Sequence, residues 1–362
     1  MAGIYVHIPF CKSRCIYCGF YSTVLTEWRD RYVDALCKEI TSLPSRQTAE
    51  TIYIGGGTPS QLTLTQLQRL FAALPKTTGE VTIECNPDDI TPEFAEGLAS
   101  LPVNRVSMGA QTFDNNRLHF LRRRHTAEQV PAAVSLLRNV GIRNISIDLM
   151  FGFPGETLQE WLSDILQAVS LGVEHISAYS LMYEEDTPLY SMKQRGEIVP
   201  VDEELSLRMY EVLIDELAKA GFEHYEISNF ARAGYRSRHN SSYWNSIPYI
   251  GIGAAAHSYD GNSRWWNISD VREYCRRIEN GESPVEEREV LDEDTRFNDL
   301  VMTRLRTCEG IDISNAPFRQ QLLRDAEKHL RGGLLILDGN RLKLTRKGLF
   351  VSDMVMSDLM RV

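Results

Sequence analysis

Residues 3–20, GIYVHIPFCKSRCIYCGF, join a strand-like run to a loop that carries three cysteines. The first part, GIYVHIP, is short and rich in β-branched residues, which is typical of a buried strand. Cys11, Cys15 and Cys18 follow directly. Reactive side chains after a strand of a parallel α/β sheet lie at its carboxyl edge, where such folds place their sites. This stretch therefore predicts a first strand with a thiol-bearing site beside it.

Five more strand-like runs follow the first, and stretches with helical spacing of apolar residues separate them. The runs are TIYIGGG (51–57), EVTIECNP (80–87), RVSMGAQ (105–111), NISIDLMFG (144–152) and HISAYSL (175–181). One intervening stretch places Val33, Leu36, Cys37 and Ile40 on a single helical face. Apolar strands that alternate with amphipathic helices predict an α/β fold with a parallel sheet. Six such units predict a partial (β/α)6 barrel.

The alternation fades after Gly221, and the remainder divides by composition. Residues 224–266 are rich in Tyr, Trp, Asn, Ser and Gly and favour strands and loops with few helical signals. Helices are then expected at 292–306, 314–331 and near 348–360, with two short strands about the turn at Asp338-Gly339-Asn340. We therefore expect a barrel over 1–222, a strand and loop extension over 223–290, and a winged-helix-like module over 291–362, which together make a C-terminal α+β region.

Composition limits the class of protein. The chain has 362 residues, of which 43% are hydrophobic and 24% charged, as in ordinary globular proteins. The start of the chain lacks the features of a signal peptide, and no apolar run approaches the roughly 18 residues of a membrane helix. We therefore expect a cytoplasmic protein that is not an integral membrane protein. A formal net charge of −10 disfavours nucleic acid as a partner, although the C-terminal module keeps that hypothesis testable by salt-dependent binding.

The three thiols suit one kind of metal site better than others. Seven cysteines in a reducing compartment are poor disulfide material. Structural zinc prefers four ligands in two pairs, and the sequence has no second CxxC or HxxxH pair. Iron–sulfur clusters are held by closely spaced thiolates, and a cubane held by only three leaves one iron open for another ligand. The spacing therefore favours a [4Fe–4S] cluster on Cys11, Cys15 and Cys18.

Polar or glycine features also end the later strands. GGGTP at 55–59 ends the second strand, and its glycines allow close approach of a ligand. Glu84, Gln111 and Asp148 end the third, fourth and fifth strands, and Arg123 can form a fork with a carboxylate. Any one of them could be a buried polar cap. Together they favour a ligand site at the carboxyl edge.

CxxxCxxC after a first strand, with Tyr17 before the last cysteine, resembles the radical S-adenosylmethionine superfamily. The resemblance implies a radical SAM barrel in which the open iron of the cluster binds S-adenosylmethionine and an electron cleaves its C–S bond. Residues of this chain that match the cofactor-lining positions are Tyr5, Tyr17, Gly56, Gly57, Thr58, Glu84, Gln111, Arg123 and Asp148.

Over nearly its whole length the sequence is similar to the oxygen-independent coproporphyrinogen III oxidase family, through YVHIPFC, GGGTP and GIGAAAHSY. Oxidases of that family carry CxxxCxxCxC, and here Phe20 stands at the extra cysteine. The HemW haem chaperone branch carries CxxxCxxCxF and a His-Asn-x-x-Tyr-Trp element, which HNSSYW at 239–244 matches. The resemblance implies a haem chaperone that delivers haem to acceptor proteins, with respiratory enzymes at the membrane as candidates. Porphyrinogen decarboxylation in porphyrin biosynthesis is the alternative.

Two histidines are candidates for the haem site. The His239 imidazole can ligate haem iron, and Tyr243 and Trp244 offer flat apolar faces that Trp265 and Trp266 could extend. The alternative is an aromatic-rich core loop whose histidine only makes hydrogen bonds. His257 in AAAHSY is the next candidate ligand.

Overall fold

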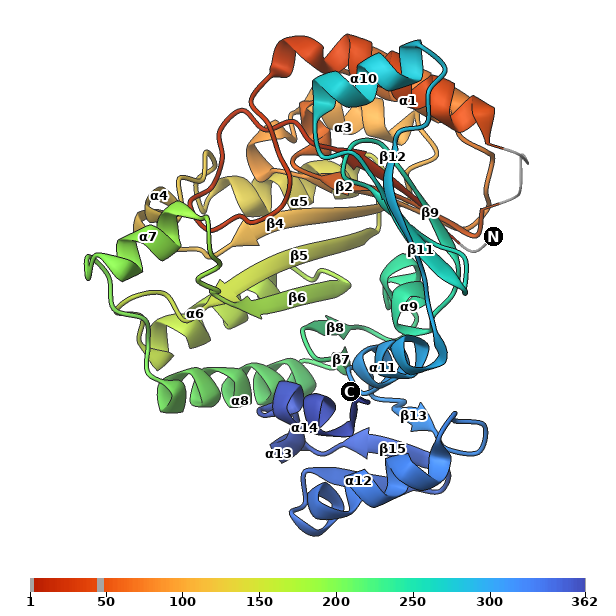
Figure 1. Ribbon diagram of the computed structural model, residues 1–362. Helices are drawn as coiled ribbons and strands as arrows, with labels where there is room; N and C mark the ends of the chain where they lie inside the picture. Colours follow the sequence, from red (N-terminus) through yellow and green to blue (C-terminus); the bar gives the residue numbers. More distant parts are fainter. Residues whose placement is uncertain (1–2, 44–48, 362) are drawn as a thin grey trace.

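A twelve-stranded open mixed sheet forms the framework of the computed structural model, which describes residues 3–43 and 49–361 (Figure 1). Its strand order is β12-β11-β10-β9-β1-β2-β3-β4-β5-β6-β8-β7. The first six strands are parallel to one another, and each lies in one of the six predicted runs. They are β1 (Gly3–Ile8), β2 (Thr51–Gly56), β3 (Glu80–Cys85), β4 (Arg105–Gln111), β5 (Asn144–Phe151) and β6 (His175–Ser180). The α/β prediction is confirmed, and the sheet is an open, partial barrel.

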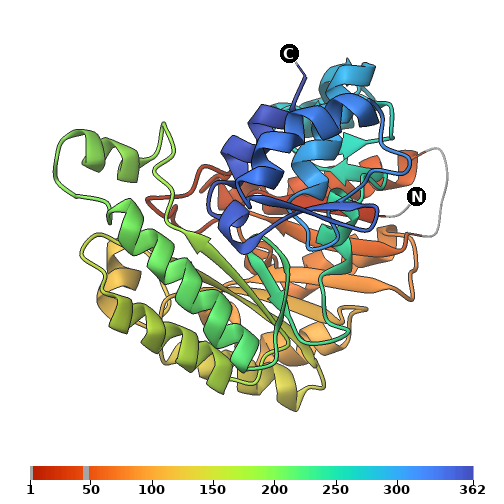
Figure 2. The ribbon, with the colours of Figure 1, turned by 90° about the horizontal axis from the view of Figure 1, so that it is seen from below.

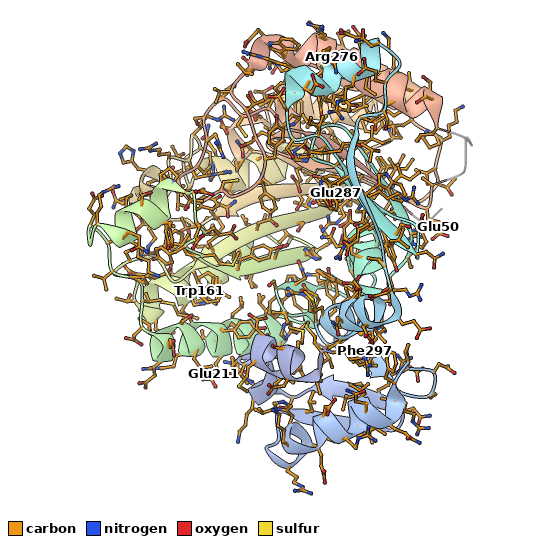
Figure 3. The ribbon with its side chains drawn as sticks, viewed as in Figure 1. Glu50, Trp161, Glu211, Arg276, Glu287 and Phe297 are labelled. Atoms are coloured by element: carbon orange, nitrogen blue, oxygen red, sulfur yellow. The ribbon has the colours of Figure 1, made fainter. Side chains whose placement is uncertain are left out.

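Helices cover the outer face of these strands (Figure 1). Thr63 with Gln66 and Thr157 with Glu160 form capping boxes that fix the starts of two of them. Val33 and Leu36 of the first helix are fully buried, as predicted, and Trp161 packs inward from the sixth (Figure 3). The helices are α1 (Arg29–Ser42), α2 (Leu64–Ala73), α3 (Pro92–Ala99), α4 (Asn115–Phe120), α5 (Gln129–Asn139), α6 (Leu158–Ser170), α7 (Pro188–Gln194) and α8 (Glu203–Lys219), with 3₁₀ turns at Thr26–Trp28, Pro59–Gln61 and Pro87–Asp89.

The inner face of the barrel is polar. Successive residues of a strand point to opposite faces, so alternate positions share the interior. Ile52, Ile83 and Val106 belong to the apolar core under the helices. The alternate positions of β2 to β6 carry Thr51, Tyr53, Thr82, Glu84, Arg105, Ser107, Ser146, Asp148, His175 and Ser177. The barrel is thus lined by groups that can contact a polar ligand.

The sheet continues at both edges beyond the parallel strands. β7 (Glu223–Glu226) and β8 (Asn229–Ala231) extend it beside β6, and β9 (Tyr249–Ile252), β10 (His257–Tyr259), β11 (Ser263–Asn267) and β12 (Val285–Val290) extend it beside β1. Two helices also occur here, α9 (Arg238–Trp244) and α10 (Val271–Glu279). The prediction of an extension with few helical signals missed both. α9 is too short to show a period; Ser237 caps it locally, and the Glu80 carboxylate of β3 accepts from its first amide.

The C-terminal segment has a core of its own around Phe297, Val301, Leu322, Leu342 and Val355 (Figure 3). It contains α11 (Glu293–Arg304), β13 (Ile311–Asp312), α12 (Arg319–Arg331), β14 (Leu335–Asp338), β15 (Arg341–Leu344), α13 (Arg346–Leu349) and α14 (Ser352–Leu359). The predicted hairpin is present, and β13 adds a third strand to it. The expected helix at 314–331 begins only at Arg319.

The C-terminal segment contacts the barrel beside β7 and α8 (Figure 2). Ile227 N donates to Arg306 O, and Arg346 pairs with Asp215 of α8 at 2.6 Å. The domain boundaries at 222 and 290 stay a prediction. Within the described ranges no helix has the length and apolar character needed to cross a membrane.

Candidate functional site

The cysteine loop leaves the carboxyl end of β1 and is closed at its base by main-chain bonds. Thr23 N donates to Pro9 O at 2.7 Å, and Cys11 N donates to Thr23 O at 2.9 Å. Cys11, Cys15 and Cys18 are free thiols, and all three are half-buried. Burial raises the pKa of Cys11 and of Cys18. The loop thus presents the three predicted thiols at the carboxyl edge of the sheet.

The Sγ atoms of Cys11, Cys15 and Cys18 do not converge on a common metal position in this structure. Among the residues that the structure describes, no group of three or more His, Cys, Asp or Glu side chains is placed to hold a metal ion. A cluster on these thiols therefore needs them to turn toward a common centre, and the ligand assignment stays a prediction.

The GGGTP turn after β2 packs directly against the cysteine loop. A Cβ at Gly57 would lie 2.8 Å from the main chain of Pro9 and 3.0 Å from Cys11 Sγ, so only glycine fits there. Gly56 has a φ of 117°, and a Cβ there would lie 2.7 Å from the His7 ring. The buried Thr58 hydroxyl lies 3.4 Å from Cys11 Sγ. The predicted glycines and Thr58 are therefore next to the predicted cluster ligand.

Arg123 joins the cysteine loop to the fourth strand. Its Nη1 lies 3.6 Å from Cys15 Sγ, and its Nη2 donates to Asn86 Oδ1 and to Gly109 O, both at 2.7 Å. Its Nε is buried without a partner in the described structure. Gln111, with a φ of 66°, folds its amide back over Gly109 beside this guanidinium. Arg123 thus has a free donor beside the predicted cluster.

The arginines on either side have other environments. Arg122 takes a left-handed conformation with a φ of 58°, and Arg124 forms ion pairs with Asp88 and Asp89 at 2.9 and 3.1 Å. Tyr17 packs on the apolar cluster of Leu121 and Phe153 below the loop. Arg123 is therefore the arginine of this run that reaches the thiols.

Two half-buried carboxyl groups face the interior of the barrel. Glu84 accepts from Tyr53 Oη at 2.7 Å and from Gly56 N at 3.1 Å. Burial raises the pKa of Glu84 to about 7. Burial also raises the pKa of Asp148 to about 6, against the opposing effect of a hydrogen bond with Ser177. Both groups are thus poised to change charge near neutral pH.

Aromatic rings line the interior beside Glu84. Tyr5 stacks on Tyr53 with 6.2 Å between ring centroids, and its hydroxyl lies 2.9 Å from His7 Nδ1. Tyr53 and the buried Arg105, whose Nε and Nη1 have no partner in the described structure, were not among the predicted site residues. The alternation along TIYIGGG and RVSMGAQ could have found both, because Tyr53 lies two residues before Gly55 and Arg105 lies six before Gln111.

HNSSYW forms α9 at the amino ends of the strands, away from the cysteine loop. The Glu80 carboxylate accepts from Arg238 N and His239 N, both at 3.0 Å. The His239 ring is 1% exposed and stacks on Tyr53 at 5.1 Å. Its Nδ1 lies 2.8 Å from Thr51 Oγ1 and its Nε2 lies 2.8 Å from Tyr243 Oη. Burial lowers the pKa of His239 to about 3.

Neither nitrogen of His239 is therefore open to iron in this arrangement. Here the ring is a hydrogen-bonded core histidine on a short helix instead of a loop, and its role as a haem ligand stays a prediction. His257 differs, since it is exposed at the start of β10 and stacks on Trp266 at 5.6 Å.

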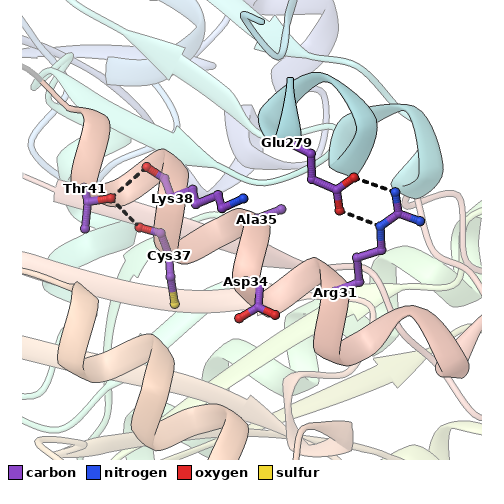
Figure 4. A pocket seen from close by; sticks show the side chains of 7 residues that line it. All are labelled: Arg31, Asp34, Ala35, Cys37, Lys38, Thr41 and Glu279. Carbon is purple, nitrogen blue, oxygen red and sulfur yellow. Dashed lines mark hydrogen bonds and ion pairs between the residues drawn. The ribbon is translucent and has the colours of Figure 1, made fainter. Parts of the chain in front are cut away.

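The hollow between α1 and α10 lies outside this site (Figure 4). Charged side chains line it, and Arg31 forms a bidentate ion pair with Glu279 there. Cys37 is the thiol in its wall. None of the predicted site residues lines it. The Arg31–Glu279 ion pair in its wall satisfies these two charges, so it does not point to a ligand.

Comparison with known sequences places two recognised regions on the chain. The profile of the radical SAM superfamily matches residues 5–168, and that of the HemN C-terminal domain matches residues 291–351. The first region spans β1 to α6 and contains the cysteine loop, GGGTP, Glu84, Arg123 and Asp148.

Among solved structures, the chain is similar to "Coproporphyrinogen III oxidase (HemN) from Escherichia coli is a Radical SAM enzyme", with a TM-score of 0.86 and 21% identity over 99% of this chain and 90% of that one. This likeness shows the fold.

Curated relatives match most of the chain. The Heme chaperone HemW of Lactococcus lactis subsp. lactis (strain IL1403) is 35% identical over 95% of this chain and 93% of its own. That of Bacillus subtilis (strain 168) is 35% identical over 86% and 85%. That of Escherichia coli (strain K12) is 36% identical over 70% and 69%. The chain therefore belongs to the HemW family of the radical SAM superfamily.

Proposed function

We propose that the chain is a haem chaperone of the radical SAM type, which binds haem and transfers it to haem-requiring acceptor proteins. The observation that carries this proposal is the similarity, over nearly the full length of both chains, to relatives named Heme chaperone HemW. The acceptors, with respiratory enzymes at the membrane as candidates, and a cytoplasmic location belong to the same proposal.

The residues present fit a [4Fe–4S] cluster with S-adenosylmethionine. The cluster would be held by Cys11, Cys15 and Cys18. Gly57, which packs against Pro9 and Cys11, and the unpartnered Nε of Arg123 lie beside it. When bound, the cluster supplies an electron and S-adenosylmethionine supplies a sulfonium whose C–S bond can be cleaved. Arg123 would take the carboxylate of the cofactor, and Glu84 would accept hydrogen bonds from its ribose hydroxyls.

Anaerobic reconstitution followed by haem titration tests the proposal. We expect a four-iron cluster per chain and saturable binding of haem, measured by iron and sulfide analysis and by Soret absorbance with and without S-adenosylmethionine. A protein that takes up zinc at this loop, or that binds no haem, would contradict it.

Coproporphyrinogen III oxidation is the second candidate, since a solved oxidase has the same fold. Phe20 disfavours it because its side chain, 74% exposed beside the cysteine loop, stands where the oxidase pattern has a further thiol. Anaerobic turnover of coproporphyrinogen III by the reconstituted protein would replace the chaperone assignment.

A further inference from the structure

The eight histidines of the chain differ sharply in how free their nitrogens are. Six have hydrogen-bond or ion-pair partners: His7, His125, His175, His224, His239 and His329. The other two, His119 and His257, are exposed, and no hydrogen bond to their rings occurs among the described residues. Of the exposed histidines among the described residues, these two can therefore offer a nitrogen to a ligand without giving up an existing bond, whereas the unpartnered Nδ1 of His125 is buried.

His257 and His119 lie in different surroundings. His119 is in the six-residue helix α4, without an aromatic neighbour among the ring contacts of the described chain. His257 stacks on Trp266, the residue opposite it on β11, with 5.6 Å between centroids and 25° between planes. Stacking uses the face of the imidazole and leaves its two nitrogens at the free edge. The indole thus holds the imidazole in one orientation.

An aromatic surface continues from His257 along the same face of the sheet. Tyr259 lies two residues further along β10, and Tyr249 of β9 is its cross-strand partner. Residues at these positions share a face. Both tyrosine rings are half-buried, and Tyr249 meets Tyr243 edge to face at 4.6 Å. A flat apolar ligand could therefore contact the rings of Trp266, Tyr259 and Tyr249 beside the unbonded imidazole of His257.

This surface adjoins the predicted cofactor site. Tyr5 pairs in register with Gly251 of β9, and a Cβ at Gly251 would fall 2.1 Å from His257 O. Glycine therefore lets β10 lie tightly against β9. His257 is thus two strands from Tyr5, on the edge of the sheet that is nearer to the cysteine-bearing strand β1.

We infer that haem binds on the face formed by His257, Tyr259, Tyr249 and Trp266, with the His257 imidazole as an axial ligand of the iron and Trp266 as the residue that positions it. Imidazole is the commonest protein ligand of haem iron, and aromatic faces suit the macrocycle. The inference rests on the proposed haem binding and moves the ligand from His239 to His257.

Haem titration of variants tests this assignment on the full-length, reconstituted protein. We expect His257→Ala to bind haem about tenfold or more weakly, with a changed Soret position, because an axial ligand is lost. Free imidazole should restore the parent spectrum by entering the vacated position. His257→Gln, which keeps a polar side chain on the exposed strand, gives the same test if the alanine variant folds poorly.

His119→Ala and His239→Gln are the matched controls, and both should bind haem as the parent does. Equal affinity and spectrum in the parent and in His257→Ala would overturn the inference, as would a loss confined to His239→Gln. Absence of saturable haem binding in the parent would instead overturn the proposed function, so the two failures are distinguishable.

Discussion

Cys15 is the thiol of the loop that contacts a cation, with Arg123 Nη1 3.6 Å from its sulfur. We expect Cys15→Ser to abolish the cluster, because the two remaining thiolates are too few to hold a four-iron cluster. Iron and sulfide content and cluster absorbance after anaerobic reconstitution measure this. Cys308→Ser, which changes an exposed cysteine far along the chain, should leave all three unchanged. Retention of a full cluster in Cys15→Ser would refute the ligand assignment.

Arg123 and Arg124 make a matched pair for testing the cofactor site. Lysine at position 123 cannot contact Asn86, Gly109 and Cys15 together, because it has a single nitrogen in place of a guanidinium fork. We expect Arg123→Lys to weaken S-adenosylmethionine binding about tenfold or more, measured by equilibrium dialysis. Arg124→Lys should stay near the parent, since Arg124 pairs with Asp88 and Asp89. Equal losses in both variants would contradict the placement.

Glu84 predicts a pH dependence of stability. Its folded pKa of about 7 lies above the ordinary value of 4.5, so the folded protein holds a proton that the unfolded chain releases. This contribution is full below the unfolded pKa and is lost as the pH rises through the folded pKa. Glu84→Gln cannot ionise. Its free energy of unfolding relative to the parent should therefore increase by up to about 3 kcal/mol between about pH 5 and pH 8.

Chemical denaturation of the cofactor-free proteins at several pH values measures that difference. Glu156 also has a raised pKa and is present in both proteins, so its effect cancels in the comparison, whereas Asp148 lies close enough to raise the pKa of Glu84 and contributes to the measured difference. Parallel stability curves for the parent and for Glu84→Gln would show that the carboxyl group is not proton-bound in the folded protein.

Among the elements, α9 is capped by Ser237, and a carboxylate from another strand also accepts from its first turn. Glu80, 5% exposed, accepts from the first two main-chain amides of this helix. Glu80→Ala leaves the buried His239 amide and the partly buried Arg238 amide without this acceptor, so we expect a loss of about 2 kcal/mol or more in the free energy of unfolding. Asp202→Ala, which removes the exposed cap of α8, should cost about 1 kcal/mol. Urea midpoints compare the two, and a smaller effect at Glu80 would contradict this role.

The same contrast explains which elements the sequence could predict. The six parallel strands have local signals, namely β-branched runs and glycine turns, and all six were predicted. α9 has only a weak local signal, its Ser237 cap, because Glu80, Thr51 and Tyr53, which also contact it, lie far away in sequence. β13 pairs over two residues only, which is too short for a pattern.

In the whole molecule, the carboxyl edge of the sheet was predictable and the haem face was not. Polar residues at strand ends must meet at one edge whenever the strands are parallel, and Cys11, Thr58, Glu84 and Arg123 do so. The roles of His239 and His257 depend on which ring the folded chain buries. The sequence around each histidine is aromatic, so only the three-dimensional packing distinguishes the buried His239 from the exposed His257 as a candidate haem ligand.

Transfer of haem is the most direct measurement of the central claim. Haem-loaded protein is mixed anaerobically with an excess of an apo-haemoprotein, and the Soret spectra and the haem content of the separated proteins are followed over time. The account predicts that the acceptor gains the haem that this protein loses. Haem that stays on the protein, with no gain by the acceptor, would contradict a chaperone.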